Sequence, residues 1–257
     1  MNILALIPAR MGSTRFPGKP MAPILGKPMI GHVHDRVIDS PLLTLTAVAT
    51  CDQEIADYVS SIGGVAVMTG AHHERASDRC AEALTILEEK NNTHYDIVVM
   101  VQGDEPMTHT DMIDEVLQPM LNDSTVQLVN LLGVIRETRD FEDRNCVKVV
   151  CDLQSNAMYF SREPIPSRWK GPDIPMGKQV AVMAFRRDFL LKYLQMTPTP
   201  LEIIESVDMM RVLEHGIKIR MALTQHTVYA VDTPDDLKRV EQLMKDKQLS
   251  EQDAVNA

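Results

Sequence analysis

The chain has 257 residues, of which 44% are hydrophobic and 24% charged, and its formal net charge is −10. This length suits one large domain with a substantial core, and the composition is typical of a globular protein. The acidic balance disfavours nucleic acid as a partner, because a negatively charged surface repels polyanions. No apolar run approaches the roughly 20 residues of a bilayer span. We therefore expect neither nucleic-acid binding nor membrane insertion.

The first predicted element is a buried strand at 3–7, "ILALI", and a basic loop follows it. This loop, "IPARMGSTRFPGKP" at 7–20, contains Arg10, Arg15 and Lys19 but no carboxylate. Within an acidic protein, such a patch indicates a small anionic ligand. A Gly/Ser/Thr-rich loop after a strand can bind phosphates through its backbone N–H groups. The spacing matches neither GxxxxGK[ST] nor GxGxxG, because a proline follows Lys19 and the two glycines stand six residues apart.

Strand-like and helix-like segments alternate through the first half of the chain. Further buried strands are predicted at 45–49, 64–68, 96–101 and 126–134, and helices at 28–39, 53–61, 77–90 and 110–121. This order predicts an α/β fold, with a mostly parallel sheet and helices on both faces. Ligands of such sheets bind at the carboxyl ends of the strands. The basic loop follows the first strand and therefore lies at that edge.

An acidic motif follows the strand at 96–101. Asp104 lies in "VQGDEP", close to the predicted ligand edge. Carboxylates are ligands that Mg²⁺ prefers in proteins. Two interpretations of Asp104 stay open here, a metal ligand or a turn residue beside a proline.

The middle of the chain changes character. Strand-like pieces flank "EPIPSRWKGPDIPMGK" (163–178), whose four prolines and two glycines exclude a helix or a central strand. We expect residues 146–200 to form an excursion that serves an acceptor site or a dimer contact, within a single domain covering 1–257. Helical patterns return at 187–195 and 201–214 and are followed by a strand at 218–224.

A second aspartate is predicted at a strand end near the C-terminus. Asp232 lies in "VYAVDTPDDL", where Thr233 and Pro234 are typical of a helix start. Asp104 and Asp232 could hold Mg²⁺ together, an arrangement that the spacing alone does not establish. We expect residues 247–257 to form a frayed tail.

Cysteine usage and the N-terminus indicate a cytoplasmic protein. The four cysteines form no CxxC pair and have no histidine at metal-ligand spacing, so we expect reduced thiols. The N-terminus has neither a basic region nor a small-residue cleavage site of a signal peptide. His72 and His73 are neighbours on a predicted loop, and we expect them to be solvated rather than to bind metal.

Five motifs together carry a family resemblance: the basic loop, "VQGDEP", "YFSR" (159–162), "PTPLEIIESVDMMRVLEHG" (198–216) and "VDTPDDL". In this order they resemble the CMP-KDO synthetases, the 3-deoxy-manno-octulosonate cytidylyltransferases, over nearly the whole chain. The resemblance implies a Rossmann-like nucleotidyltransferase fold and a homodimer. It also implies Mg²⁺-dependent transfer of CMP from CTP to the anomeric hydroxyl of an acidic 2-keto-3-deoxy sugar. Pyrophosphate is released, and the product serves lipopolysaccharide or cell-surface polysaccharide synthesis.

The resemblance also implies roles for particular residues. The implied catalytic residues are Arg10, Lys19 and Asp104, and the implied Mg²⁺ ligands are Asp104 and Asp232. The nucleotide side comprises Ala9, Arg10, Ser13, Arg15, Lys19, Ser77 and Arg79, with Ala76 where the family usually has glycine. The acceptor-sugar side comprises Gln102, Arg162, Gln179, Glu205 and Asp208.

The departures from the family pattern gather on the acceptor side. Where the family often reads "RHLGIYGYR", this chain has "KQVAVMAFR" (178–186), so a histidine becomes Gln179 and two tyrosines become Met183 and Phe185. The family's Glu-Gln pair becomes Asp208-Met209. Loss of hydrogen-bonding groups alters specificity for polar substrates. An amino-modified KDO or another acidic 2-keto-3-deoxy sugar would fit, and family drift with unchanged KDO specificity stays open.

Two other functions stay open. The first is a cytidylyltransferase for a nonulosonic acid, neuraminate-like or legionaminate-like, which would share the loop and the metal site. The second is a non-catalytic nucleotide-binding homologue, which the presence of Arg10, Lys19, Asp104 and Asp232 disfavours. For the enzymes, phosphoryl chemistry needs positioning and charge neutralisation. We therefore expect no Ser or Cys nucleophile.

Overall fold

The computed structural model describes residues 1–13, 15–170, 175–227 and 229–255, with side chains through residue 247. Contacts group the chain into two compact units. Unit 1 comprises Met1–Ile3, Tyr95–Met100 and Asp111–Thr227, and unit 2 comprises Leu4–His94, Val101–Thr110 and Val228–Ala257. The single domain over 1–257 stays a prediction. None of the described helices combines the length and apolar character needed to cross a membrane.

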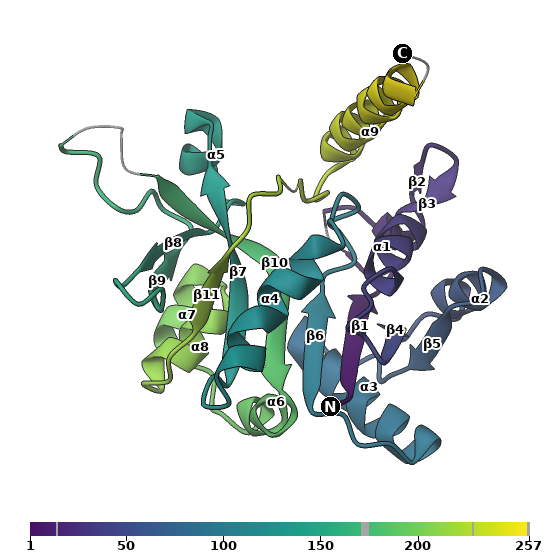
Figure 1. The fold of residues 1–257 in the computed structure, drawn as a ribbon, viewed down its shortest axis with the longest axis horizontal. Helices are drawn as coiled ribbons and strands as arrows, with labels where there is room; N and C mark the ends of the chain where they lie inside the picture. Colours follow the sequence, from purple (N-terminus) through teal and green to yellow (C-terminus); the bar gives the residue numbers. More distant parts are fainter. Residues whose placement is uncertain (14, 171–174, 228, 256–257) are drawn as a thin grey trace. The chain divides into compact units, whose positions relative to one another are not determined.

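Unit 2 is built on a parallel sheet (Figure 1). Its strands follow the order β1 (Ile3–Ala9), β4 (Leu45–Thr50) and β5 (Val65–Met68). The helices that pack on β4 or β5 are α1 (Met29–Ile38), α2 (Gln53–Ser61) and α3 (Ala76–Asn91). All seven residues of β1 are buried. The predicted ligand loop therefore starts from a fixed point at the carboxyl end of a core strand.

A smaller core in unit 2 joins the end of the basic loop to the C-terminal helix. After the 3-10 turn at Lys19–Met21, the hairpin strands β2 (Pro23–Ile24) and β3 (Lys27–Pro28) lead into α1. Helix α9 (Pro234–Val255) packs against β2. The buried side chains of this core are Ile24, Met29, Val231, Val240 and Met244. This packing brings the segment around Asp232 back to the basic loop.

Unit 1 contains a mixed sheet. Its order is β11 (Arg220–Leu223), β7 (Leu128–Ile135), β10 (Met176–Arg186) and β6 (Ile97–Val101), with β8 (Lys148–Cys151) pairing β10 and β9 (Ala157–Ser161). β7 is parallel to β11 and antiparallel to β10. The helices are α4 (Asp111–Asn122), α5 (Thr138–Glu142), α6 (Arg187–Leu194), α7 (Pro200–Glu205) and α8 (Asp208–Glu214). The predicted α/β fold is confirmed.

Two local predictions differ from the structure. The helix expected over 201–214 is two helices, because Ser206 adopts a left-handed conformation (φ 51°) between α7 and α8. The strand expected before Asp232 is not formed by residues 229–232. Helix α9 continues to Val255, and the frayed tail expected at 247–257 stays a prediction. Residues 256–257 lie outside the described residues, as do 171–174 of the Pro/Gly-rich segment.

Candidate active site

The basic loop is closed by its own backbone and attached to a neighbouring strand end. Gly18 donates its N–H to the Met11 carbonyl oxygen at 3.0 Å, and its φ of 75° is a conformation that glycine adopts readily. The Met11 N–H donates to Asp52 Oδ2 at 2.8 Å, and Asp52 immediately precedes α2. Ser13 Oγ accepts from the Phe16 N–H at 3.3 Å. These bonds fix the curved backbone from which Arg10, Arg15 and Lys19 extend.

Lys19 joins the two aspartates that the sequence singled out. Its Nζ lies 2.8 Å from Asp104 Oδ2 and 3.5 Å from Asp232 Oδ1, and Arg15 Nη2 lies 3.0 Å from the same Asp232 oxygen. The Lys19 side chain is 13% exposed, against 26% for Asp104 and 22% for Asp232. Partial burial weakens the screening of such charges by solvent. Two cations and two carboxylates thus neutralise one another at the loop.

Backbone contacts bring Asp104 and Asp232 together although 128 residues separate them. The Val231 N–H donates to the Asp104 carbonyl oxygen at 2.9 Å, which joins the two segments directly beside the aspartates. Gly103 lies so close to β1 that an added Cβ would meet the Pro8 carbonyl oxygen at 3.1 Å. Thr233 Oγ1 accepts from the Asp236 N–H at 3.2 Å, which confirms the predicted helix start. The sequence around Asp104 and around Asp232 does not itself indicate that the two segments lie together.

Helix α3 supplies the predicted nucleotide-side residues Ser77 and Arg79, both buried. Arg79 Nη1 donates to Thr69 Oγ1 at 2.6 Å and lies 3.4 Å from the Gly70 carbonyl oxygen. Its Nη2 is buried and has no hydrogen-bond partner among the described residues. A buried guanidinium nitrogen without an acceptor is costly, so this atom is suited to an acceptor group on a ligand.

Glu82, which sequence reasoning missed, holds the turn that follows β5. Glu82 Oε2 accepts from the Gly70 N–H at 2.8 Å and makes a short contact with His73 Nε2. Burial, the largest influence, would raise the pKa of Glu82, but the Gly70 N–H and His73 outweigh it and lower that pKa. The expectation of a solvated His73 is wrong, since its side chain is 13% exposed. The local sequence carries no signal for this role, because the turn that Glu82 contacts lies nine to twelve residues earlier.

Arg10 contacts the same turn. Its Nη1 donates to the His73 carbonyl oxygen at 3.3 Å, and the side chain is otherwise exposed. Ala9 is buried at the end of β1. The predicted nucleotide-side residues therefore belong to one unit, at the end of β1, on the loop that follows it and on α3.

On the predicted acceptor side, Arg162 and Glu205 form one network in unit 1. The Arg162 guanidinium donates to the carbonyl oxygens of Glu205, Ser206 and Arg144 at 2.7, 3.0 and 2.9 Å. The Glu205 carboxylate accepts from Ser161 Oγ, Tyr159 Oη and the Arg162 N–H at 3.0, 3.2 and 2.8 Å. These contacts stabilise the break between α7 and α8, which no glycine or proline marks in the sequence.

The other acceptor-side residues differ in their exposure. Gln179 is half-buried, and its Nε2 donates to Asn130 Oδ1 at 2.7 Å. Asp208 begins α8 and is half-buried, whereas Met183, Phe185 and Met209 are at most 5% exposed. These three substitutions fill the core rather than line a surface. Gln102 follows β6 in unit 2 and is half-buried.

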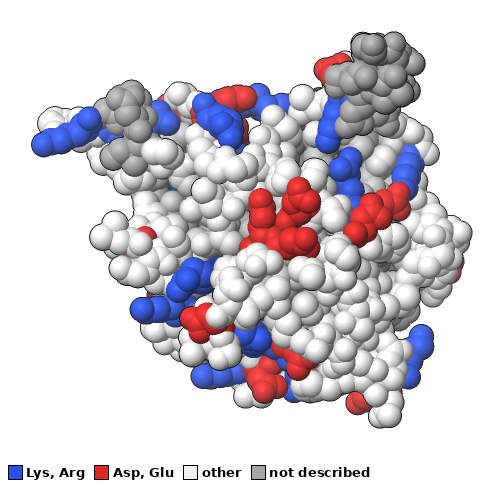
Figure 2. Space-filling model, in the orientation of Figure 1, with Lys and Arg blue, Asp and Glu red and all other residues white. Residues whose placement is uncertain are grey.

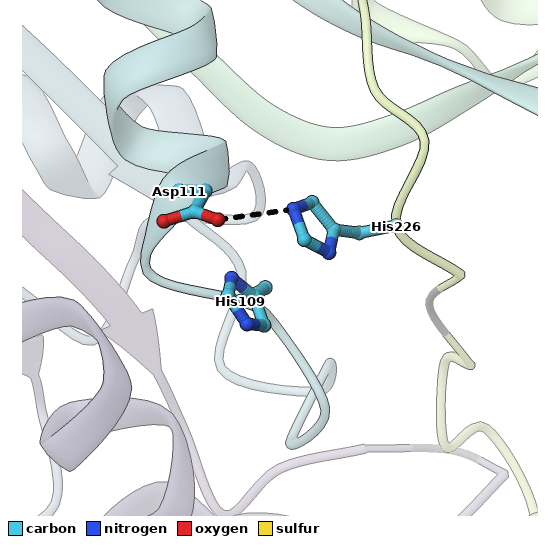
Figure 3. Close-up of side chains that lie close together, drawn as sticks. All are labelled: His109, Asp111 and His226. Carbon is cyan, nitrogen blue, oxygen red and sulfur yellow. Dashed lines mark ion pairs between the residues drawn. The ribbon is translucent and has the colours of Figure 1, made fainter.

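Two further observations concern groups outside these clusters. His226 Nε2 lies 3.5 Å from Asp111 Oδ2, an ion pair within unit 1 (Figure 3); His109, drawn beside it, belongs to unit 2. Exposed pairs of this kind contribute about 0–1 kcal/mol. On the face drawn in Figure 2, acidic and basic side chains are interspersed, and the described residues there form no continuous basic surface.

The cysteines are free thiols, as expected. Cys80 is fully buried on α3, and burial raises its pKa far above the ordinary value. Burial also raises the pKa of Cys146 and of Cys151. A high pKa disfavours the nucleophilic thiolate, so these three thiols are poor candidates for covalent catalysis.

The chain is similar in sequence to known cytidylyltransferases. A family model described as cytidylyltransferase matches residues 4–219. A 3-deoxy-manno-octulosonate cytidylyltransferase of Geobacter metallireducens is 42% identical over 251 residues, covering 93% of this chain and 96% of the relative. One of Geobacter sulfurreducens is 42% identical over 256 residues, covering 95% and 100%.

Solved structures give the same result. A CMP:2-keto-3-deoxy-manno-octonic acid synthetase complexed with CTP superposes with a TM-score of 0.86 at 35% identity, covering 96% of this chain and 100% of the other. A cytidylyltransferase from Leptospira borgpetersenii shares the fold with a TM-score of 0.62 at 18% identity, covering 94% and 85%. The chain belongs to the cytidylyltransferase family.

Proposed function

We propose that this chain transfers CMP from CTP to the anomeric hydroxyl of KDO or of a modified 2-keto-3-deoxy acid sugar, releasing pyrophosphate. The observation that carries the proposal is the convergence of Arg15, Lys19, Asp104 and Asp232 at the closed loop after β1. The relatives named for this reaction and the solved relative complexed with CTP support it. The activated sugar would serve lipopolysaccharide or cell-surface polysaccharide synthesis.

The residues of unit 2 suit the nucleotide half of this reaction. Arg10, Arg15 and Lys19 supply positive charge for a triphosphate, and the closed loop presents backbone N–H groups beside them. The unpartnered Nη2 of Arg79 offers a buried donor to an acceptor on the nucleotide. Holding the triphosphate in one orientation favours in-line attack at the α-phosphorus, and fixed cations stabilise the charge of the departing pyrophosphate.

The proposal includes Mg²⁺ held by Asp104 and Asp232. The donor set fits this ion, because both residues offer partly exposed carboxylate oxygens and these already share one cation, the Lys19 ammonium. When bound, Mg²⁺ would polarise phosphate oxygens and favour ionisation of the attacking hydroxyl. The chain's own part is to orient the two carboxylates through the Val231–Asp104 backbone bond and to supply Lys19.

Between these acceptors, we propose that the altered residues favour a modified KDO, such as an amino-substituted one, over ordinary KDO. Gln179, bonded to Asn130, replaces an imidazole of the family pattern, and Asp208 replaces a glutamate. Both are half-buried, whereas Met183, Phe185 and Met209 are buried in the core. A changed set of donors and acceptors alters the preference between polar substrates strongly.

We also propose that the enzyme is a homodimer in the cytoplasm. Several large apolar side chains of unit 1 are exposed, including Met158 at 63%, Trp169 at 90% and Ile204 at 76%. Exposed apolar groups of this size suit a protein contact. Sedimentation of the wild type and of Ile204→Glu tests the dimer. If Ile204 lies in the dimer contact, the variant should dissociate into monomers at a higher protein concentration than the wild type.

Pyrophosphate release tests the proposed reaction. Purified protein is incubated with CTP, Mg²⁺ and, separately, KDO, an amino-substituted KDO or neuraminate, and the CMP-sugar is detected by mass spectrometry. Release with a 2-keto-3-deoxy octulosonate supports the proposal, and release with neuraminate alone favours the nonulosonic acid alternative. Absence of release with all three acids would indicate a non-catalytic homologue. Asp104→Asn is the negative control.

A further inference from the structure

One carboxylate of helix α3 attaches two points of the turn at residues 70–73. Glu82 Oε2 accepts from the Gly70 N–H at 2.8 Å and contacts His73 Nε2, three residues further on. A single oxygen therefore closes the turn and couples it to the helix. The Glu82 side chain is 35% exposed and the His73 side chain 13%, so the contact lies at the edge of the site.

The start of the same turn is attached to α3 independently. Arg79 donates to Thr69 Oγ1 at 2.6 Å, and Thr69 Oγ1 lies 3.2 Å from the Thr50 carbonyl oxygen at the end of β4. The Thr69 N–H also donates to that carbonyl at 2.8 Å. With the start fixed in this way, the position of His73 depends on Glu82.

The last residue of the turn, His73, contacts Arg10 of the basic loop. The His73 carbonyl oxygen accepts from Arg10 Nη1 at 3.3 Å. Arg10 lies directly after the rigid strand β1, and its side chain is exposed beyond this contact. The carbonyl thus limits the directions that the guanidinium can take.

We propose that Glu82 is a positioning residue of the nucleotide site, holding His73 so that its carbonyl oxygen orients Arg10. This inference rests on the proposed function, because it assigns the oriented guanidinium to CTP. The described hydrogen bonds of Glu82 lead to Gly70 and His73, and Arg10 meets the turn at the His73 carbonyl oxygen. Its effect on the nucleotide therefore passes through the turn.

The test compares Glu82→Ala and Glu82→Gln with Glu89→Ala, which removes an exposed carboxylate from the same helix. Glu82→Ala should raise the KM for CTP about ten-fold, the effect of losing a charge-assisted contact, and leave the KM for the sugar unchanged. Glu82→Gln keeps an oxygen for the Gly70 N–H and should recover part of the loss. Glu89→Ala should match the wild type.

A double mutant separates positioning from general weakening of the fold. In an Arg10→Ala background, Glu82→Ala should cause little further rise in the KM for CTP, because coupled residues are not additive. If the rises in the KM for CTP of the two single variants add fully in the double mutant, the inference is overturned. It is also overturned if the KM for CTP of Glu82→Ala and of Glu82→Gln equals that of Glu89→Ala.

Hydrogen exchange supplies a readout that does not depend on turnover. The Gly70 amide should exchange faster in Glu82→Ala than in the wild type or Glu89→Ala, because its acceptor is removed. Unchanged exchange would show that Glu82 does not hold the turn and would overturn the inference. A wild type that exchanges as expected but does not turn over CTP would defeat the proposed function instead.

Discussion

Lys19 Nζ lies 2.8 Å from Asp104 Oδ2, so a lysine of the basic loop forms an ion pair with a carboxylate proposed to hold Mg²⁺. The same ammonium lies 3.5 Å from Asp232 Oδ1. At the proposed Mg²⁺ site, Lys19 would therefore compete with the divalent cation when no nucleotide is bound. Phosphate oxygens would compete in turn for Lys19, so we expect cation binding and nucleotide binding to favour each other.

Removing this ammonium should expose the aspartate pair to metal. In Lys19→Met, Mn²⁺ should bind more tightly in the absence of CTP than it does to the wild type, by about ten-fold, because a neighbouring positive charge is lost. Titration calorimetry or the electron paramagnetic resonance signal of free Mn²⁺ measures this. Lys90→Met, which removes an exposed lysine from α3, is the matched control. Equal Mn²⁺ affinity in Lys19→Met and the wild type would contradict the competition.

The aspartates should matter for rate and not for folding. Asp104→Asn or Asp232→Asn should lower kcat/KM for CTP by about 10²–10³-fold, since each removes a charge that orients the reacting groups. Both side chains are partly exposed, so thermal unfolding should change little. Initial rates of pyrophosphate release measure the effect. Near-normal turnover of Asp104→Asn would disprove its assignment as a metal ligand.

Local patterns predicted the fold well because the core strands are continuous apolar runs. β1 is entirely buried, as "ILALI" indicated, and α2 has the predicted bounds of 53–61. The break at Ser206 was not predictable, since it depends on Arg162 reaching the carbonyl oxygens at the end of α7. Side-chain contacts across 43 or 44 residues leave no periodic signal in the sequence.

The residue types of the candidate site could be predicted from the sequence, but the ion pairs and hydrogen bonds between them could not. Arg15, Lys19, Asp104 and Asp232 were singled out from their sequence context, and the structure brings their side chains together. Glu82 was missed because a glutamate on an amphipathic helix is normally a solvated residue. Its role depends on a turn nine to twelve residues earlier that only the fold brings within reach.

A buried ion pair should dominate the stability of the α7–α8 region. Arg211 donates to both carboxylate oxygens of Glu202 at 2.6 and 2.7 Å, and these side chains are 7% and 0% exposed. Arg211→Met leaves Glu202 charged and buried, and it should destabilise the protein by about 3–5 kcal/mol. Urea unfolding measures the loss. The exposed pair Lys238–Asp235 is the comparison, and Lys238→Met should cost far less. Similar losses for both would contradict the assignment.

The contribution of Glu82 to stability should depend on pH. Its pKa in the folded state is lower than the ordinary 4.5. Such a group stabilises the fold above pH 4.5 and loses that contribution as the pH falls through the lower, folded-state pKa. The difference in unfolding free energy between the wild type and Glu82→Gln should therefore shrink in acid. Urea titrations across the acidic range measure it, with Glu89→Gln as the control for removing a charge from α3. A difference that does not change with pH would contradict the lowered pKa.

Gln179 should help to set the choice of acceptor sugar. Its Nε2 donates to Asn130 Oδ1 at 2.7 Å, and Asn130 Nδ2 in turn donates to the Val180 carbonyl oxygen at 2.7 Å, so the Gln179 amide is held in one orientation. Gln179→His restores the imidazole of the family pattern. We expect it to shift the ratio of kcat/KM between KDO and an amino-substituted KDO toward KDO by about ten-fold or more, because polar contacts decide between polar substrates.

Steady-state kinetics with each sugar at saturating CTP measures this ratio. Gln195→His changes an exposed glutamine of the same unit and should leave it unaltered. The KM for CTP should stay constant in both variants, since Gln179 and Gln195 lie in unit 1 and the nucleotide-side residues lie in unit 2. A ratio that Gln179→His does not move would mean that this position packs against Asn130 without contacting the acceptor. Specificity would then have to come from Asp208, the other half-buried substitution, and Asp208→Glu would be the variant to measure.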